Sequence, residues 1–462
     1  MPDENQIIQY LQDANPWWQD GKPPAEAGLY KRDGFFSLQK NLSLRQILSL
    51  VGLRRVGKTI AIKQTIGFLI KEKKINPKRV MFFSFEEVEG GLRSDFLEKV
   101  LYVYFKIILG KELPEIKNKV YIFLDEIQYV SFWQGGLKRF YDLNPNLKFI
   151  VSGSSSLFIR KKAQESLAGR IFETKMPVLS FKEYLILSGK KELSEIMLKE
   201  SFLDLTEKKI NVLRAKANPH ITQLNFWYQK YFLFGHFPEP ITEKFSEEQT
   251  KQYIKDSVLK KILGSDMPKI LKVDNPEEFS TIFNILAAET GNVLEYQNLA
   301  QESHLAQVTV KKYIHYLNEA FLISLVYNYS KSLRPKKKFL KKHYVQSTNF
   351  SNTLFNLDLK TLLSTGAVGH LVETQVFNVL QEQFERIEFW NKRGEEVDFV
   401  LDGRQLVEVK YRPKLRHEDW RMILKTMDKF KVKKGFLLSQ NDLSIVRKGN
   451  KDIIIVPACL LS

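Results

Sequence analysis

The chain has 462 residues, of which 44% are hydrophobic, and its 71 Lys and Arg residues against 53 Asp and Glu give a formal net charge of +18 at pH 7. This apolar content excludes a wholly disordered chain, and the length predicts about three domains. The positive charge favours a polyanionic partner such as nucleic acid, although a lysine-rich surface without such a partner is the alternative.

Cysteine usage and hydropathy indicate the compartment. Cys459 is the single cysteine, which excludes an intramolecular disulfide and fits a reducing environment. Residues 1–20 are polar and acidic, unlike a signal peptide, and the apolar runs are too short to cross a bilayer. We therefore expect a soluble cytoplasmic protein with no membrane partner.

The first part of the chain predicts an α/β fold. Residues 1–45 are expected to form a leader. From about residue 46 to 180, continuous apolar runs alternate with helix-like runs, which predicts a parallel sheet covered on both faces. The strands are expected at Ile47–Gly52, Arg79–Phe85, Val120–Asp125, Leu147–Ser152 and Phe172–Val178.

A phosphate-binding motif follows the first strand. Gly52–Thr59 fits G-x-x-x-x-G-K-[ST], in which the glycines admit phosphates to backbone N–H groups, the lysine reaches the β- and γ-phosphates and the hydroxyl binds Mg²⁺. The helix that follows adds its dipole to the anion site. We therefore predict ATP and Mg²⁺ as cofactors. The expected nucleotide contacts are Gly52, Leu53, Arg54, Arg55, Val56, Gly57, Lys58, Thr59 and Ile60.

The strand Val120–Asp125 carries an acid pair at its carboxyl end, where ligands bind in open α/β sheets. Asp125 is expected to hold Mg²⁺ together with Thr59, and Glu126 to orient or deprotonate the attacking water. The spacing from Lys58 to Asp125 leaves room for one further helix–strand–helix unit.

Two further positions are candidates for acting on the γ-phosphate. Either Ser152 or Ser154 could sense it by a hydrogen bond, or the segment is an ordinary Ser/Gly turn. Arg170 could stabilise transition-state charge, in its own subunit or in a neighbouring one of an oligomer. A structural surface arginine is the alternative.

These motifs resemble those of the prokaryotic AAA-type ATPases that carry a DUF4143 C-terminal region. The resemblance rests on Gly52–Thr59, Leu124–Gln128, Ser152–Ser154, Gly169–Arg170, Pro177–Tyr184 and the turn Gly235–Pro240. It covers nearly the whole chain. It implies ATP binding on a sheet of the ASCE/AAA type and leaves the biological role open.

Residues 181–270 are expected to form a helical lid, and residues 275–345 a winged-helix domain of three helices and a hairpin. The hairpin strands are expected at Ile323–Tyr329 and Phe339–Val345, joined by a basic wing at 331–342. The wing charges are Lys331, Arg334, Lys336, Lys337, Lys338, Lys341 and Lys342, with no acid among them.

Like charges at this density favour a neutralising partner. We expect the third helix to expose Lys311, Lys312 and His315 in a DNA major groove, with the basic wing on the backbone. A winged helix that makes only protein contacts is the alternative.

Residues 365–462 predict a small α/β domain with a carboxylate cluster. Glu373 lies on an expected helix, Asp398 on a strand, and Glu408 and Lys410 at the end of the next strand. Asp398 and Glu408 would bind a divalent cation beside a phosphodiester, while Lys410 would position or activate water. The expected elements are the helix His370–Phe384, the strands Ile387–Trp390, Val397–Leu401 and Gln405–Lys410, a helix near His417–Phe430 and a closing strand near Gly435–Ser439.

This arrangement resembles the PD-(D/E)xK nuclease core, with Glu373, Asp398, Glu408 and Lys410 in the matching places. The segment Gly394–Val397 lacks the proline that names the motif. The resemblance implies a nuclease-like fold and leaves open whether the domain cleaves or only binds.

Two functions fit these expectations. The chain is either a nucleotide-driven enzyme acting on DNA, or a slow ATP-dependent switch that binds a protein or DNA through a non-cleaving domain. An RNA-directed enzyme is a third reading.

Overall fold

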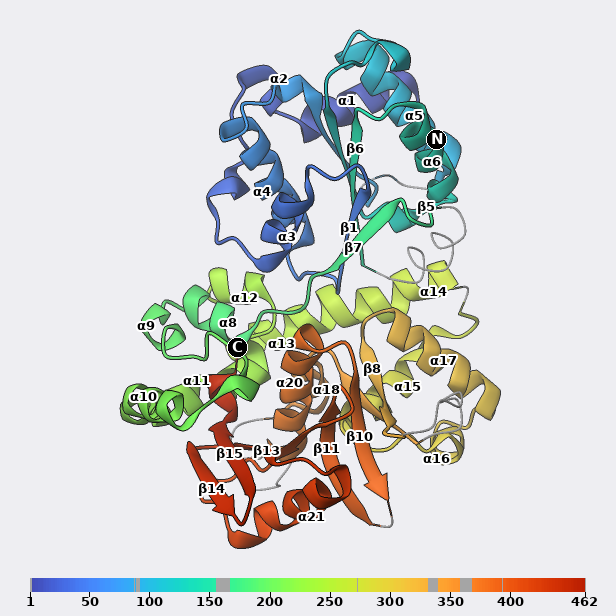
Figure 1. Ribbon diagram of the computed structural model, residues 1–462. Helices are drawn as coiled ribbons and strands as arrows, with labels where there is room; N and C mark the ends of the chain where they lie inside the picture. Colours follow the sequence, from blue (N-terminus) through green and yellow to red (C-terminus); the bar gives the residue numbers. More distant parts are fainter. Residues whose placement is uncertain are drawn as a thin grey trace. The chain divides into compact units, whose positions relative to one another are not determined.

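The computed structural model describes residues 2–86, 88, 92–154, 167–271, 273–330, 340–357, 368–392 and 394–461. The chain folds as two compact units (Figure 1). The first comprises Met1–Pro177 with Glu319–Phe321, and the second comprises Val178–Asn318 with Leu322–Ser462.

A five-stranded parallel sheet forms the centre of the first unit. Its order is β2-β4-β6-β1-β7, and every neighbouring pair is parallel. The strands are β1 (Ile47–Val51), β2 (Val80–Ser84), β4 (Val120–Asp125), β6 (Leu147–Gly153) and β7 (Ile171–Lys175). All five were expected, and β6 lies between the P-loop strand β1 and the acidic strand β4, which confirms the ASCE/AAA-type sheet.

Helices cover both faces of this sheet. Helices α3 and α4 pack together, as do α5 and α6, and Figure 1 shows the two pairs on opposite sides. A short parallel pair, β3 (Leu92–Arg93) with β5 (Val130–Ser131), lies beside α5. The helices are α1 (Glu4–Ala14), α2 (Trp17–Asp20), α3 (Asp33–Asn41), α4 (Lys58–Lys71), α5 (Ser94–Val103) and α6 (Trp133–Leu143).

The region expected as a leader is part of the first unit and closes the edge of its sheet. Strand β2 has β4 on one side, and its other side is met by side chains from the turn after α1. Asn15 is fully buried; its amide donates to Phe82 O at 2.8 Å and its oxygen accepts from Phe82 N at 2.6 Å. The indole N–H groups of Trp17 and Trp18 both donate to Val80 O. Side chains here pair with a strand edge as a further strand would.

The second unit contains a mixed eight-stranded sheet of order β14-β15-β13-β12-β11-β10-β8-β9. The antiparallel hairpin β8–β9 joins it through a parallel pairing of β8 with β10. The expected wing hairpin is therefore continuous with the C-terminal sheet. The strands are β8 (Ile323–Asn328), β9 (Lys341–Val345), β10 (Ile387–Lys392), β11 (Glu395–Leu401), β12 (Gln405–Val409), β13 (Lys434–Ser439), β14 (Ser444–Lys448) and β15 (Lys451–Pro457).

The closing strand expected near Gly435–Ser439 is β13, but the chain continues into the antiparallel pair β14–β15. Strand β15 then pairs parallel with β13 along six residue positions from Lys434 to Ser439. The expectation that β13 ends the sheet was wrong, because the apolar run Ile453–Val456 forms a further buried strand.

The helices of residues 181–270 share a core with this sheet. Phe181, Tyr231 and Leu224 belong to the same buried cluster as Phe377 of α20 and Phe399 of β11. This region, expected as a lid, is therefore built into the second unit. Its helices are α8 (Phe181–Leu187), α9 (Lys191–Ser194), α10 (Glu207–Ala217), α11 (Ile221–Phe234), α12 (Pro238–Thr242), α13 (Glu247–Tyr253) and α14 (Met267–Leu271).

The turn Gly235–Pro240 is held from several sides. A Cβ on Gly235 would lie 2.7 Å from the Tyr184 ring, so the packing admits glycine alone without a shift. His236 is buried; its backbone N donates to Asn349 Oδ1 and its Nδ1 contacts Ser347 Oγ. The remaining helices are α15 (Pro276–Ala288), α16 (Tyr296–Glu302), α17 (Gln307–Glu319), α18 (Thr348–Phe355), α20 (Val368–Gln383) and α21 (Arg421–Phe430).

The edge closure at β2 generates a prediction. We expect Asn15→Ala to lower the free energy of unfolding by about 2–4 kcal/mol, because it leaves Phe82 N–H and C=O buried without their partner. Urea denaturation measures the change. Gln12→Ala, at an exposed position of α1, should change it by less than about 0.5 kcal/mol. Equal effects of the two substitutions would show that Asn15 does not close the edge.

Candidate functional site

The P-loop leaves β1 at Gly52 and enters α4 at Lys58. A Cβ on Gly52 would lie 2.2 Å from the backbone oxygen of Met176, so no other residue fits without a shift of the backbone. Gly57 caps α4 with a φ of 98°, a conformation that favours glycine. The two glycines of the motif therefore each satisfy a distinct backbone constraint.

The lysine of the motif is buried inside the loop. Lys58 is 4% exposed, and its Nζ donates to Leu53 O at 3.0 Å and to Gly52 O at 3.2 Å. It also lies 3.4 Å from Glu126 Oε1 at the end of β4. The expected meeting of the P-loop lysine with the acid pair is therefore present.

Asp125, the last residue of β4, accepts hydrogen bonds from the start of α4 and from β6. Thr59 Oγ1 donates to Asp125 Oδ2 at 2.7 Å, and Ser152 Oγ of β6 donates to Oδ1. Burial, followed by the charge of Glu126, raises the pKa of Asp125 to about 6. A cation placed here would favour the ionised form, so the carboxylate is suited to a metal ion beside Thr59.

Glu126 sits at a strained backbone position with φ of 51° and is buried among donors. Burial favours its neutral form, but the charge of Lys58, the hydrogen bond from Gln128 and the charge of Arg54 outweigh burial and lower its pKa. Glu126 is therefore held as a carboxylate, the form that accepts a proton.

Gln128 is a site residue that the sequence reasoning missed. Its amide nitrogen donates to Glu126 and, at 3.0 Å, to Ser154 Oγ. Its amide oxygen is buried and has no hydrogen-bond partner within the described ranges. The only signal in the sequence was the position of Gln128, two residues after Glu126. In the structure a 3-10 turn brings its side chain back to the site.

Of the two serines, Ser152 contacts the acid pair on both residues, since it also accepts from Glu126 N at 3.2 Å. Ser154 reaches the pair through Gln128. Both are buried, and both lie at the carboxyl end of β6, next to β1. Sensing of the γ-phosphate by either serine stays a prediction, with an ordinary Ser/Gly turn as the alternative.

The other loop residues have separate roles. Arg54 pairs with Glu86 and donates to Tyr129 OH at 3.4 Å, while Leu53 and Val56 are buried in the core. Val56 O accepts from Arg32 of the N-terminal region at 2.6 Å. Arg55 is exposed with φ of 67°, and Ile60 is half-buried in the first turn of α4.

Arg170 lies at the amino end of the strands, opposite the end that carries the P-loop. Its backbone oxygen accepts from Ile47 N, at the start of β1, whereas the P-loop follows the end of that strand. The length of β1 separates the two by roughly 15 Å. Its side chain pairs with Asp142 of α6 at 3.0 Å. This position is far from the P-loop of the same chain. A role in a neighbouring subunit and a structural surface arginine paired with Asp142 both stay predictions.

These residues fit a nucleoside triphosphate with Mg²⁺. The loop supplies a glycine-lined turn and the buried Lys58 ammonium for the phosphates. The Thr59 hydroxyl and the negatively charged Asp125 carboxylate are suited to the metal ion. The buried, unpartnered oxygen of Gln128 offers an acceptor for a water or hydroxyl beside Glu126.

The C-terminal cluster is also assembled as expected. Glu373 comes from α20, Asp398 from β11, Glu408 from β12, and Lys410 follows β12. Lys410 Nζ lies 2.6 Å from Glu408 Oε1, and Val409 N donates to Asp398 Oδ2 at 2.8 Å. Burial, then the charge of Asp398, raises the pKa of Glu373 to about 7 and that of Glu408 to about 8.

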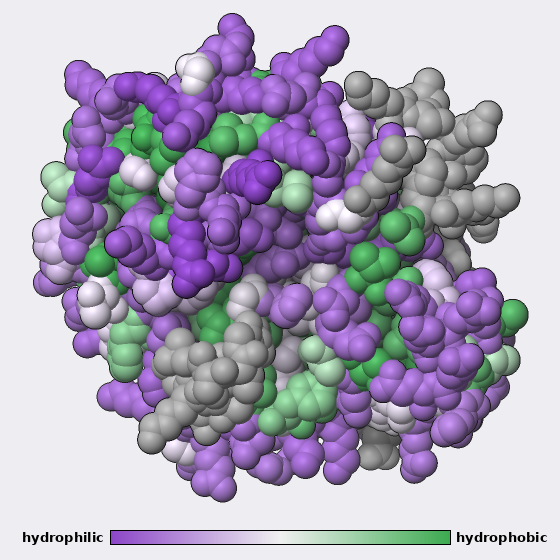
Figure 2. Space-filling view, turned by 90° about the horizontal axis from the view of Figure 1, so that it is seen from below, coloured by the Kyte–Doolittle hydropathy of each residue, from purple (hydrophilic) through white to green (hydrophobic). Residues whose placement is uncertain are grey.

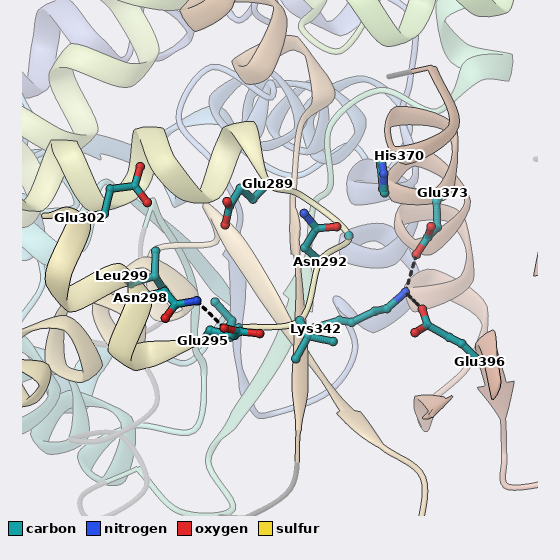
Figure 3. A pocket seen from close by; sticks show the side chains of 13 residues that line it. Glu289, Asn292, Glu295, Asn298, Leu299, Glu302, Lys342, His370, Glu373 and Glu396 are labelled. Carbon is teal, nitrogen blue, oxygen red and sulfur yellow. Dashed lines mark hydrogen bonds and ion pairs between the residues drawn. The ribbon is translucent and has the colours of Figure 1, made fainter. Parts of the chain in front are cut away.

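Lys342 corrects one expectation. It was expected on the solvated wing, but it is 4% exposed and points into the cluster from β9. Its Nζ lies 2.6 Å from Glu396, 3.1 Å from Glu373 and 3.9 Å from Asp398, and Figure 3 shows it reaching between the first two. In the described part of the chain, no three His, Cys, Asp or Glu side chains are arranged to hold a metal ion. The metal-binding role expected of Asp398 and Glu408 stays a prediction, with the Lys342 ammonium now a competing cation beside Asp398.

A cavity of ≈ 460 Å³ adjoins this cluster (Figure 3). Glu373, Glu396 and Lys342 form one wall, and carboxylates of Glu289 and Glu295 lie across from them. Solvent therefore reaches the Lys342 end of the cluster.

The three helices α15, α16 and α17 precede the hairpin β8–β9 in the order expected of a winged helix. Lys311, Lys312 and His315 are exposed on α17, as expected. Lys312 lies 3.7 Å from Asp274, and Lys311 donates to Gln307 at 3.2 Å. Residues 331–339 of the wing lie outside the described residues.

Among the helices that the structure describes, none has the length and apolarity needed to span a bilayer.

Different family models match the N-terminal and C-terminal parts of the chain. Residues 44–185 match the family model described as "AAA domain", and residues 368–460 match DUF4143, a domain of unknown function. Residues 225–360 match a second domain of unknown function, DUF8612. These matches confirm the resemblance inferred from the motifs.

The curated relatives are uncharacterized. MJ1637 of Methanocaldococcus jannaschii is 25% identical over 89% of this chain and 84% of its own length. A Haemophilus influenzae protein is 22% identical over 68% of this chain and 74% of its own. Two similar solved structures are the Aeropyrum pernix Orc1 protein in complex with DNA and the Thermotoga maritima RuvB Holliday junction branch migration motor. The match to Orc1 covers 74% of this chain and 96% of that chain, at 12% identity and a TM-score of 0.31. The match to RuvB covers 72% of this chain and 99% of that chain, at 14% identity and a TM-score of 0.29.

The steric limit at Gly52 generates a prediction. Gly52→Ala should reduce ATP affinity more than tenfold, because the added methyl group displaces the loop from Met176 O. Isothermal titration calorimetry measures the affinity. Gly135→Ala is the matched control, since a Cβ there meets nothing within 4 Å. Wild-type affinity in Gly52→Ala would contradict the loop geometry.

Proposed function

We propose that this chain, which joins an AAA domain to a DUF4143 domain, is a Mg²⁺-dependent ATPase that couples its nucleotide state to nucleic-acid binding. The observation that carries the ATPase half is the contact of Lys58 and Thr59 with the acid pair Asp125 and Glu126. The nucleic-acid half rests on charge and on the second unit.

Each residue of the P-loop site has a part in this function. Backbone N–H groups of the loop and the Lys58 ammonium bind the phosphates, and Thr59 with Asp125 holds Mg²⁺, which supplies positive charge to the phosphate oxygens. Phosphate oxygens compete with Gly52 O, Leu53 O and Glu126 for the Lys58 ammonium. Glu126 then loses an ion-pair partner and becomes a stronger base.

Gln128 and Ser154 complete the water position. Gln128 donates to both Glu126 and Ser154, so it fixes the carboxylate relative to the end of β6. Its free amide oxygen accepts a hydrogen bond from the attacking water, whose other proton Glu126 accepts.

Charge and surface support the nucleic-acid half. The net charge of +18 and the exposed Lys311, Lys312 and His315 of α17 suit a phosphate backbone. Figure 2 shows one face on which hydrophilic side chains cover most of the coloured surface, with hydrophobic ones in small groups between them. DNA is favoured over RNA because three helices and a hairpin of this order suit a major groove.

A non-cleaving regulatory switch is the second candidate. The observation that favours it is the position of the Lys342 ammonium, 3.1 Å from Glu373 and 3.9 Å from Asp398, where it competes with a metal ion for these carboxylates. In that case the second unit binds DNA or a protein, and ATP turnover is slow.

The role of Glu126 predicts a separation of binding from hydrolysis. Glu126→Gln should keep ATP affinity within about threefold while lowering the hydrolysis rate by about 10²–10⁴, because the amide cannot accept the water proton. Steady-state phosphate release and calorimetry measure the two quantities. Glu98→Gln, on a surface pair with Arg139, should leave both unchanged. Hydrolysis by Glu126→Gln at the wild-type rate would remove it from the mechanism.

The basic wing predicts a salt effect. Replacing Lys336, Lys337 and Lys338 with Ala should flatten the dependence of log affinity for duplex DNA on log salt by about 0.9 for each lost phosphate contact. Fluorescence anisotropy over a salt series measures the slope. The matched control removes three exposed lysines of α10, Lys208, Lys209 and Lys216. Equal slopes for the wing variant and the wild type would exclude the wing from DNA binding.

A further inference from the structure

The carboxylate cluster of the second unit contains two lysines that enter from different strands. Lys410 was expected from the motif, but Lys342 comes from β9, at the edge of the sheet. Both side chains are largely removed from solvent, at 5% exposure for Lys342 and 31% for Lys410. The four carboxylates around them are Glu373, Glu396, Asp398 and Glu408.

The carboxylate oxygens of the motif already have donors from the chain itself. Glu408 Oε1 faces Lys410 at 2.6 Å, and Glu408 Oε2 accepts from Asp398 N at 3.4 Å. Asp398 Oδ2 accepts from Val409 N at 2.8 Å. Mg²⁺ in proteins is usually held by one or two carboxylates, with waters in the other octahedral positions. The carboxylate oxygens named here face protein donors instead.

One oxygen each of Glu373, Glu396 and Asp398 faces Lys342. Glu373 Oε1 accepts from Lys342 at 3.1 Å and from Tyr344 OH at 2.7 Å, while Asp398 Oδ1 lies 3.9 Å from the same ammonium. Lys342 and Tyr344 are two apart on β9, so strand alternation places both on the cluster side. The adjacent Lys341 lies 3.3 Å from Tyr296 OH.

The register of β9 is fixed on its outer side as well. Leu294 N donates to Lys341 O at 2.7 Å, and Gly291 N donates to His343 O at 2.8 Å. The strand is thus held between β8 and the segment 291–294. Since a shift by one residue would turn Lys342 away from the cluster, this pairing secures the ammonium in place.

We propose that the Lys342 ammonium takes the place of a divalent cation among Glu373, Glu396 and Asp398, so that this domain is a nuclease-like fold that does not bind the catalytic metal. A fixed charge from β9 offsets part of the negative charge of the cluster and ties the wing hairpin to α20 and β11. The proposal rests on the nuclease-like reading of the domain given above. It needs neither ATP turnover nor DNA binding, so its failure is distinguishable from theirs.

Access does not prevent metal entry. The cavity beside the cluster is lined by Lys342, Glu373 and Glu396, and it is ≈ 460 Å³ in volume (Figure 3). A hydrated cation can therefore reach the carboxylates, and competition with Lys342 decides whether it binds.

Mn²⁺ titration of the full chain without nucleotide, followed by electron paramagnetic resonance, tests the proposal. Wild type and Asp398→Asn should bind the same number of Mn²⁺ ions, because Asp398 holds none. Lys342→Met should gain one ion per chain, at least tenfold tighter than any gained by Lys342→Met combined with Asp398→Asn. Lys341→Met, which removes the neighbouring charge outside the cluster, should gain none.

Three outcomes would overturn the proposal. Loss of an ion on going from wild type to Asp398→Asn would show that the cluster holds metal with Lys342 present. A folded Lys342→Met variant that gains no ion would show that Lys342 does not stand in for a cation. Mg²⁺-dependent DNA cleavage by wild type that Asp398→Asn abolishes would show that the cluster uses a metal. If Lys342→Met does not fold, as judged by circular dichroism, the comparison of wild type with Asp398→Asn decides alone.

Discussion

The carboxyl edge of the parallel sheet in the first unit is the constraint on which its site depends. Since β1, β6 and β4 are neighbours and run in one direction, residues that follow each of them meet at one edge. Thr59 and Lys58 follow β1, Ser152 is the penultimate residue of β6, and Asp125 ends β4. The hydrogen bond from Thr59 to Asp125, at 2.7 Å, closes this arrangement. Glu126 N donates to Ser152 at the same edge, and Gln128 donates to Glu126.

Each unit places a buried ammonium among carboxylates, with different results. Lys58 lies beside Glu126 and two backbone oxygens, all of which phosphate oxygens can replace. Lys342 lies among three carboxylates and is fixed by strand pairing on both sides of β9. An exchangeable partner suits a ligand site, whereas a fixed one suits a permanent joint. Burial makes either charge costly to leave unpaired.

The sequence was sufficient for the parts of the fold with local signals. The five strands of the first sheet, the P-loop and the acid pair follow from continuous apolar runs and fixed motif spacing. Lys342 could not be assigned, because a lysine in a basic run looks solvated until the pairing of β9 is known. The place of Arg170 could not be predicted either, since its pairing with the start of β1 appears only once β7 is placed beside that strand. Gln128 carried a weak signal in its spacing from Glu126.

The closure of the β2 edge by Asn15, Trp17 and Trp18 bears on where the first unit begins. The AAA family match starts at residue 44, so a fragment cut to that boundary lacks all three side chains. Its β2 would present bare N–H and C=O groups along an apolar strand, a template for intermolecular pairing. Fragments of this first unit should therefore start before α1 if they are to stay monodisperse, whatever the extent of sequence similarity.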